Sequence, residues 1–193
     1  MHLTSCITNR AAAFYSIVAP YLNGTKVLVE FCAGDGKGGA EFDNSSLENI
    51  IFVDKRKPNK FQHTAEQLKT PFEYKILDIN NTIIPQGSIV IAIHACGILT
   101  DIALEKAIKA SLGFAIMPCC YNQNMKKYSL RNPPDNRKLC YPAEKDYYDA
   151  FRLQYIQEQG YNAILSQIDE RITPMNNILI GIPEFSYKDG DNK

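Results

Sequence analysis

The sequence VLVEFCAGDGKGG, residues 27–39, decides the fold of this chain. A β-rich apolar run, Val27 to Phe31, leads directly into a turn with glycines at positions 34, 36, 38 and 39. Glycine lets the backbone turn tightly and approach a ligand closely, because it has no Cβ atom to clash. The segment therefore predicts a strand, a ligand-binding turn and the approach to a helix, as in an α/β domain.

Short apolar runs alternate with helix-like stretches along the rest of the chain, which is the pattern of a parallel sheet with crossover helices. After the first strand we expect strands at 49–53, 74–77, 88–93, 114–117, 163–168 and 177–182, and helices at 9–21, 62–68, 100–111 and 143–159. No helical stretch separates the last two strands, so we expect that pair to be antiparallel.

The 193 residues are expected to form a single domain. We divide it into an N-terminal helix (1–24), a cofactor-binding half (25–120), a lid or loop (121–142), a C-terminal helix with a hairpin (143–185) and a polar tail (186–193). Twenty-one basic residues balance twenty-one acidic ones, which argues against a strongly basic nucleic-acid domain but not against a local basic patch. No apolar stretch is long enough to span a membrane and no signal peptide is visible. We therefore expect a cytoplasmic monomer with free thiols.

Acidic side chains end the first three strands: Glu30, Asp54 and Asp78. The carboxyl ends of parallel strands meet at one edge of an open α/β sheet, and ligands bind there. Asp54 lies 20 residues after Gly34, which suits a grip on ribose hydroxyls. Taken singly, Asp54 and Asp78 are also compatible with helix caps or turn residues.

Gly34, Gly36 and Gly39 also match the G-x-G-x-x-G spacing of dinucleotide-binding turns, which leaves an NAD-dependent oxidoreductase open. In such a site the pyrophosphate meets the helix N-terminus that follows the strand. Glu30 lies at that edge here, and a carboxylate would repel pyrophosphate while accepting hydrogen bonds from an ammonium group. S-adenosylmethionine, which carries an amino acid, a ribose and an adenine but no phosphate, suits these acids better.

Five sequence segments carry a family resemblance. VEFCAGDGKGG with IIFVDKR, residues 29–39 and 50–56, resembles the first two motifs of class I S-adenosylmethionine-dependent methyltransferases. HACGILTD (94–101), MPCCY (117–121) and ITPMNNILIG (172–181) resemble a subgroup that includes the tRNA acceptor-stem 2′-O-ribose methyltransferases. The same subgroup contains the methyltransferase domain of the glutathione S-transferase C-terminal domain-containing proteins.

The resemblance implies a Rossmann-like fold with a seven-stranded, mostly parallel sheet, one antiparallel strand and helices on both faces. It also implies S-adenosyl-L-methionine as cofactor, with Glu30 near the methionine amino group, Asp54 on the ribose and Asp78 facing adenine. The implied cofactor-binding residues are Glu30, Cys32, Ala33, Gly34, Gly36, Asp54, Lys55, Asp78, Ile79 and His94.

Cys32, Cys96, Cys119 and Cys120 each lie at or just past the end of an expected strand, and we expect them to gather with His94 around one crevice. Three interpretations stay open: small apolar side chains that pack the site, a thiol of lowered pKa that takes part in chemistry or redox sensing, or a zinc site. No CxxC spacing is present, and adjacent cysteines are poorly placed to share one tetrahedral ion. We therefore predict no metal.

His94 is the candidate general base, because the ordinary pKa of histidine lies near neutrality. A histidine that bonds a neighbouring loop is the alternative. Asp101 either orients His94 or favours a helix dipole as a first-turn acid. The catalytic candidates are His94, Asp101, Cys119, Cys120 and Tyr121.

The methyl acceptor stays open between RNA, protein and a small molecule. Lysines and arginines concentrate at residues 55–60 and in the expected loop, where they could contact phosphates or form an ordinary solvated surface. The RNA-contact candidates are Lys126, Lys127, Arg131, Arg137 and Lys138, with Tyr128 and Tyr141 for base stacking. A non-catalytic cofactor-binding or interaction module is the alternative outside the enzymes.

Overall fold

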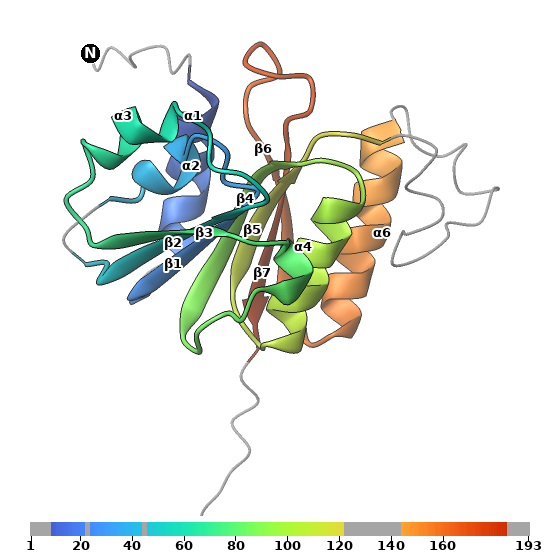
Figure 1. Cartoon of the computed structure of the whole chain (residues 1–193). Helices are drawn as coiled ribbons and strands as arrows, with labels where there is room; N and C mark the ends of the chain where they lie inside the picture. The colour runs from blue at the N-terminus through green and yellow to red at the C-terminus, as the bar shows by residue number, and fades with distance from the viewer. Residues whose placement is uncertain (1–8, 22–23, 44–45, 122–143, 185–193) are drawn as a thin grey trace, which may run out of the picture.

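A computed structural model describes residues 9–21, 24–43, 46–121 and 144–184 of the chain. Its strands are β1 (Val27–Phe31), β2 (Asn49–Asp54), β3 (Phe72–Ile76), β4 (Ser88–Ala95), β5 (Phe114–Pro118), β6 (Tyr161–Gln167) and β7 (Asn177–Pro183). They form one seven-stranded sheet in the order β3-β2-β1-β4-β5-β7-β6 (Figure 1). The strand order reverses at β1 and β4, so the ligand crevice of a doubly wound fold is expected beside these two strands.

The helices are α1 (Arg10–Val18), α2 (Lys37–Ala40), α3 (Phe61–Ala65), α4 (Ile98–Lys109) and α6 (Glu144–Glu158), with 3₁₀ turns η1 (Ala19–Tyr21) and η2 (Ile79–Asn81). Asn9 caps α1, and its side chain accepts a hydrogen bond from the N–H of Ala11 at 3.0 Å. In the described ranges, no helix is long and apolar enough to cross a membrane.

The pairing of the strands confirms the predicted sheet. β1, β2, β3, β4 and β5 pair in parallel, while β7 runs antiparallel to both β5 and β6. Each expected strand and helix in the described part of the chain is present, with bounds that differ by a few residues. β3 begins at Phe72 rather than at residue 74, and α3 ends at Ala65 rather than at residue 68. Residues 122–142 of the expected loop and the tail from 186 lie outside the described residues.

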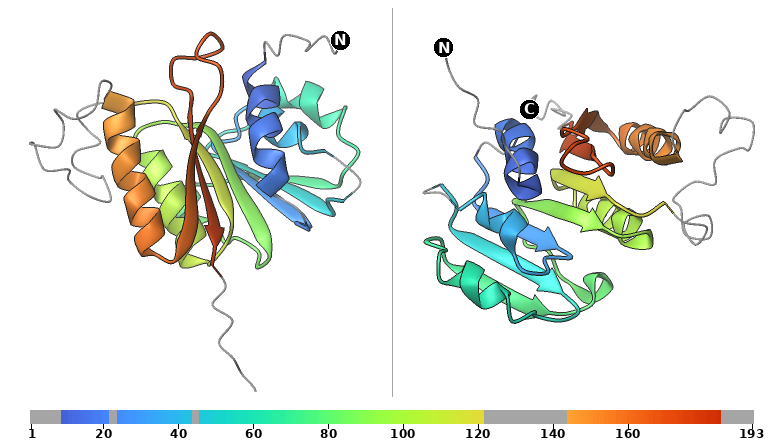
Figure 2. Two further views of the ribbon diagram at one scale, coloured as in Figure 1. Left: turned by 180° about the vertical axis from the view of Figure 1, so that it is seen from behind. Right: turned by 90° about the horizontal axis from the view of Figure 1, so that it is seen from above.

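Helices cover both faces of the sheet (Figure 2). Neighbouring residues of β1 point to opposite faces, as the period of a strand requires. Val29 packs in one apolar core with Leu104 of α4 and Ile156 of α6, and Leu28 packs in the other with Phe14 of α1 and Phe61 of α3. Burial on both faces is why β1 reads as a continuous apolar run broken only by Glu30.

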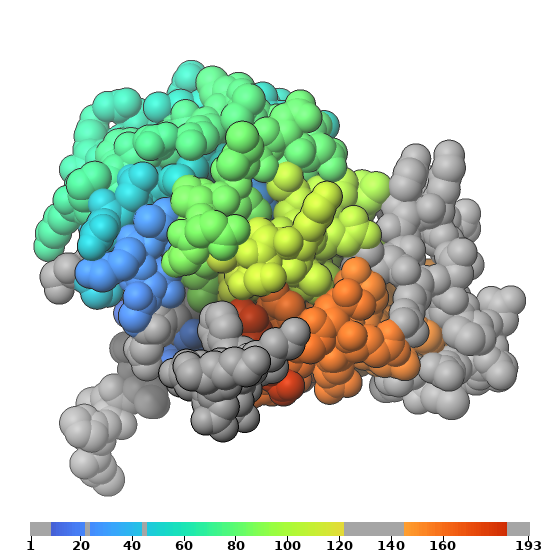
Figure 3. Space-filling view, turned by 90° about the horizontal axis from the view of Figure 1, so that it is seen from below, coloured from blue at the N-terminus to red at the C-terminus, as the bar shows by residue number. Residues whose placement is uncertain are grey.

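The two edges of the sheet differ in what they carry. The carboxyl ends of the parallel strands share one edge with the glycine turn and the starts of α2 and α4 (Figure 1). Figure 3 shows the opposite edge, where the parallel strands begin and β7 ends. The predicted ligand residues at the ends of β1, β2 and β4 thus lie along a single edge.

Candidate functional site

The turn after β1 is held in backbone conformations that favour glycine. Gly34 and Gly36 have φ angles of 51° and 76°, in the left-handed region where other residues are strained. A Cβ atom on Gly36 would also lie 2.6 Å from Cε2 of Phe61 in α3. The turn therefore needs glycine at position 36 on two separate grounds, and it leads the chain from β1 into α2.

Glu30 carries a carboxylate that is almost fully buried, with 2% of the residue exposed. Its Oε2 accepts a hydrogen bond from the N–H of Gly39 at 2.8 Å. A Cβ atom on Gly38 would lie 2.2 Å from Oε1 of Glu30, so glycine leaves the space that the carboxylate occupies. Burial raises the pKa of Glu30, and this effect is larger than the lowering by the Gly39 hydrogen bond. The resulting pKa of Glu30 is about 8. A cation that reached this carboxylate would offset its cost of burial.

A cavity of about 410 Å³ opens beside Glu30, between α1, the glycine turn and the end of β4. Five of the predicted cofactor residues line it: Glu30, Cys32, Ala33, Gly34 and His94. The predicted residues from β1, the turn and β4 therefore share one space.

A second cavity of about 260 Å³ lies at the end of β2 and is lined by Asp54, Lys55 and Ile79 among others. Oδ2 of Asp54 accepts a hydrogen bond from the N–H of Gly34 at 2.9 Å, which ties the end of β2 to the glycine turn. Cys32 lines both cavities, so the two adjoin at this residue. The structure thus offers two connected compartments, one with a buried carboxylate and one with a carboxylate at a strand end.

Asp78 has a different place from the one expected. It caps η2 by accepting a hydrogen bond from the N–H of Asn80 at 2.8 Å, and its other oxygen lies 3.0 Å from Nζ of Lys55. These contacts hold the pKa of Asp78 below its ordinary value. From this segment, Leu77 and Ile79 line the second cavity rather than Asp78. The structure therefore favours the cap that the sequence left as an alternative.

His94 is placed by an irregularity in β4. Ile93 pairs with Met117 and Ala95 pairs with Pro118, so His94 is the extra residue of a β-bulge, with a φ angle of 60°. Bulges of this kind re-aim side chains beside functional sites. The ring lines the larger cavity.

The ring of His94 has one partner and one unpaired nitrogen. Nη1 of Arg10 lies 3.1 Å from Nδ1, whereas Nε2 is buried and has no hydrogen-bond partner. Burial, and next the charge of Arg10, lower the pKa of His94 to about 4. The imidazole is therefore neutral at neutral pH, with Nε2 available for a hydrogen bond.

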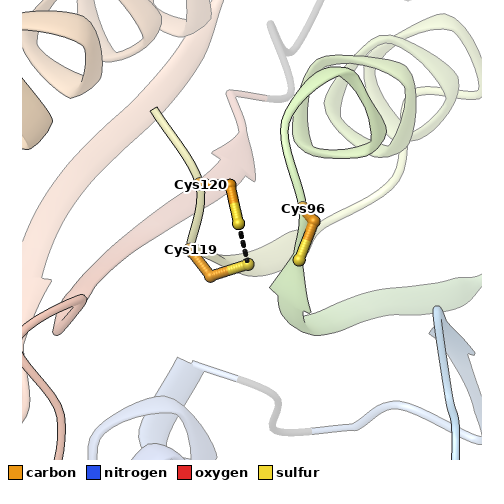
Figure 4. Close-up of side chains that lie close together, drawn as sticks. All are labelled: Cys96, Cys119 and Cys120. Carbon is orange, nitrogen blue, oxygen red and sulfur yellow. Dashed lines mark hydrogen bonds between the residues drawn. The ribbon is translucent and has the colours of Figure 1, made fainter. Parts of the chain in front are cut away.

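Three thiols follow the ends of β4 and β5. The Sγ atoms of Cys96, Cys119 and Cys120 all lie within 4.8 Å of one another (Figure 4). The Sγ atoms of Cys96 and Cys119 each lie 3.5 Å from the carbonyl oxygen of His94. Burial raises the pKa of Cys119 and of Cys96. Cys32 is not one of these three mutually close thiols, but it lines the larger cavity together with His94.

Asp101 and Tyr121 take part in a buried ionic network instead of contacting His94. Arg152 of α6 donates from Nε to Asp101 at 2.7 Å and from Nη1 to Asp149 at 2.8 Å. The hydroxyl of Tyr121 donates to the second oxygen of Asp149. Neither Asp101 nor Tyr121 lines either of the two cavities. Their position favours a structural function over the catalytic one predicted for them.

Sequence reasoning missed the residues that α1 brings to the site. Asn9, Arg10 and Ala11 line the larger cavity. The cation Arg10 at the start of the expected helix is the signal that could have drawn attention to this end of α1. The basic candidates for RNA contact, residues 126–138, and the stacking candidates Tyr128 and Tyr141 lie outside the described residues.

A family model described as a methyltransferase domain matches residues 12–127. The glutathione S-transferase C-terminal domain-containing protein of Homo sapiens is 28% identical over 122 residues, which cover 48% of this chain and 19% of that protein. Its counterpart from Xenopus laevis is 26% identical over 200 residues, or 87% of this chain and 33% of that protein. The chain thus spans a third or less of the length of these relatives.

Solved structures agree on the fold. The 1,6-didemethyltoxoflavin-N1-methyltransferase of Burkholderia thailandensis, solved with 1,6-didemethyltoxoflavin and S-adenosylhomocysteine, matches with a TM-score of 0.57 and 11% identity over 94% of this chain and 80% of that one. At such low identity the match shows the fold alone. The family model, in contrast, covers more than half of the residues, and its match begins in α1 and extends beyond the thiols at the end of β5. The chain therefore belongs to the methyltransferase-domain family, with the fold of class I S-adenosylmethionine-dependent methyltransferases.

Proposed function

We propose that the protein binds S-adenosylmethionine across the two adjoining cavities and transfers its methyl group to an acceptor that enters beside His94. The observation that carries this proposal is the pair of carboxylates, Glu30 in the larger cavity and Asp54 in the smaller one, with Cys32 lining both. The ligand must therefore place a cation in one compartment and hydrogen-bond donors in the other.

The methionine part of the cofactor fits the larger cavity. Its ammonium group would meet the carboxylate of Glu30, which has a single donor at Gly39 among the described residues. The ribose fits the smaller cavity, where Asp54 accepts one hydrogen bond at each oxygen, at 2.9 Å from Gly34 and at 3.4 Å from Arg56. A carboxylate has about four lone-pair sites, so Asp54 retains acceptors for two ribose hydroxyls.

The acids also argue against the NAD-dependent oxidoreductase. A pyrophosphate at the start of α2 would lie against Glu30, which offers it no cation and which would repel it in the ionised form. Gly38 and Gly39 are needed to hold the Glu30 carboxylate, and not only to let a phosphate approach the backbone. The glycines of the turn thus make room for the carboxylate of Glu30.

When bound, S-adenosylmethionine supplies a methyl group already activated on a sulfonium. The chain then has to align the acceptor with this methyl group and exclude competing water. His94 lines the cavity that would hold the methionine part, and its Nε2 has no partner. Arginine can only donate, so Nδ1 accepts from Arg10 and the neutral ring carries its proton on Nε2. In our proposal Nε2 donates a hydrogen bond to the acceptor, while Arg10 fixes the ring through Nδ1.

Calorimetric titration tests the cofactor. We expect S-adenosylhomocysteine to bind the purified protein with one site per chain and NAD to bind at least a hundredfold more weakly. Tight binding of NAD without binding of S-adenosylhomocysteine would overturn the proposal.

The acceptor is tested by a screen with S-adenosylmethionine labelled in its methyl group. Cell RNA, protein and metabolite fractions are offered separately, and the labelled fraction identifies the acceptor class. RNA, protein and a small molecule are the candidate acceptors, and the basic residues at 126–138 support RNA. Label in no fraction, together with tight binding of S-adenosylhomocysteine, would favour the non-catalytic module.

A further inference from the structure

The thiol cluster is a feature that the proposed methyl transfer does not use. Cys96 comes from the turn between β4 and α4, and Cys119 and Cys120 directly follow β5. Figure 4 shows the three side chains pointing toward a common space. The Sγ atoms of Cys119 and Cys120 are 3.5 Å apart, and no pair in the group is separated by more than 4.8 Å.

These separations suit a shared metal ion. A zinc–sulfur bond of about 2.3 Å places two sulfur ligands about 3.8 Å apart in a tetrahedral site and about 4.0 Å apart in a trigonal one. The sulfur atoms of the cluster lie from 3.5 Å apart to at most 4.8 Å apart, so rotations of the side chains alone bring them to an ion. The adjacency of two cysteines is therefore no obstacle, because the chain leaves β5 with both thiols on the same side.

We propose that Cys96, Cys119 and Cys120 together bind one thiolate-preferring metal ion, either zinc or monovalent copper. Soft thiolate ligands select these ions over magnesium, calcium or manganese. Binding exchanges the thiol protons for the ion, so each ligated sulfur becomes a thiolate and its proton goes to the solvent. No redox step is involved.

A disulfide is the competing use of the same thiols, and the backbone opposes it for the closest pair. Consecutive Cα atoms are about 3.8 Å apart, below the roughly 4.4–6.8 Å that unstrained disulfides span. Cys119 and Cys120 are consecutive, so a bond between them would be strained. A bond from Cys96 to either partner would leave one thiol over, whereas an ion engages all three.

The thiol cluster lies next to the backbone of His94, whatever the function of the site. The Sγ atoms of Cys96 and Cys119 lie 3.5 Å from the carbonyl oxygen of His94. An ion in the cluster would therefore join the ends of β4 and β5 and fix the bulge that carries His94. The thiols would act on the site by positioning this residue.

The test is a metal titration of the full-length, reduced protein in a background of Cys6→Ser and Cys140→Ser, with a phosphine as reductant. This background leaves the four described thiols as the sulfur ligands. Zn²⁺ and Cu⁺ are offered separately in competition with a chromophoric chelator, and Co²⁺ reports thiolate ligation by its charge-transfer absorption. We expect one ion per chain and a loss of at least a hundredfold in affinity for Cys96→Ser and for Cys119→Ser.

Cys32→Ser is the matched control, since it removes a thiol outside the cluster and should leave metal affinity within a few fold of the parent. Thermal unfolding without metal shows whether each variant is folded, and Cys120→Ser at an exposed position serves if another variant is not. The preferred ion, zinc or copper, is read from the two competition arms. Binding that survives Cys96→Ser and Cys119→Ser, or no 1:1 binding of either ion, would overturn the proposal.

Discussion

Replacing Glu30 by glutamine tests the central acid of the site with a side chain of nearly the same shape. Glutamine keeps an oxygen that can accept the hydrogen bond from Gly39, now 2.8 Å long, but it carries no charge. The variant should lose most of its affinity for S-adenosylhomocysteine, because an ammonium group then faces an amide. A hydrogen bond to a charged group contributes about 1.5–3 kcal/mol, so the loss should be about ten- to a hundredfold.

The pH dependence follows from the same side chain. In the free protein the pKa of Glu30 is about 8, so at about pH 7 the carboxyl is about nine-tenths protonated. Pairing with an ammonium requires the carboxylate, so binding releases about one proton per ligand. Wild-type affinity should therefore rise about tenfold per pH unit below about pH 8 and then level off. Glutamine at position 30 should remove this slope.

The stability of the wild type should fall with rising pH, whereas its affinity for the ligand rises. The folded pKa of Glu30 lies above its ordinary value of 4.5, so between these values the folded state binds more protons than the unfolded one. The free energy of unfolding of the wild type therefore falls as pH rises from about 4.5 to about 8. Glu30→Gln has no such loss and should be the more stable protein above about pH 8, by up to about 5 kcal/mol.

Calorimetry in buffers of different ionisation enthalpy counts the protons released. Urea unfolding at about pH 6 and pH 9 measures the fall in wild-type stability that the variant should not show. 5′-Methylthioadenosine is the matched ligand, because it shares the adenosine and lacks the amino acid. Its affinity should be the same for both proteins and independent of pH in this range. The reasoning is refuted if S-adenosylhomocysteine shows the same pH-independent affinity for wild type and variant.

Three further substitutions separate the other parts of the site. Gly38→Ala places a Cβ atom 2.2 Å from Oε1 of Glu30, so unfolding in urea should show a loss of about 1–3 kcal/mol, and titration should show weaker cofactor binding. Asp54→Asn should weaken the binding of S-adenosylhomocysteine about ten- to a hundredfold, whereas Asp78→Asn should change this affinity less than about threefold. Equal effects of the two variants in calorimetry would contradict the assignment of the ribose to Asp54. Arg152→Met leaves two buried carboxylates without their cation and should cost about 3–5 kcal/mol in urea unfolding, and an unchanged midpoint would argue that the network is solvated.

The part of the site at the end of β1 could be predicted because strand ends fix it. A continuous apolar strand, buried on both faces, must end at the glycines, and Glu30 and Asp54 then lie at one edge of the sheet whatever the packing of the helices. The reason for Gly38 and Gly39 was not visible in the same way. A Cβ atom on either would collide with Glu30, and that contact exists only once α2 has folded back on β1.

Contacts between distant segments were beyond the sequence. Arg10 and His94 are 84 positions apart, and no periodicity relates the start of α1 to a bulge in β4. Asp101 was placed correctly at the start of α4, but Arg152, 51 positions away, decides what its carboxylate does. Residue type and strand-end position therefore predicted which side chains lie near the site, while long-range partners determined which of them face it.

Hydrogen bonds connect the motifs HACGILTD and MPCCY in the folded protein. The hydroxyl of Thr100 donates to the carbonyl oxygen of Ala95, which closes the turn that carries Cys96. Asp101, the next residue along α4, reaches through Arg152 and Asp149 to the hydroxyl of Tyr121.

Thr100, Asp101 and Tyr121 therefore connect the two segments that carry the thiols. One of these segments also contains His94 with its strained backbone. A non-glycine residue at positive φ costs about 1–3 kcal/mol and persists only where its surroundings over-determine it. The buried network ties α4, which follows the Cys96 turn, to Tyr121, which follows Cys120, and so restrains the segments next to His94. It follows that polar residues outside both cavities can be as necessary to the site as the carboxylates that line them.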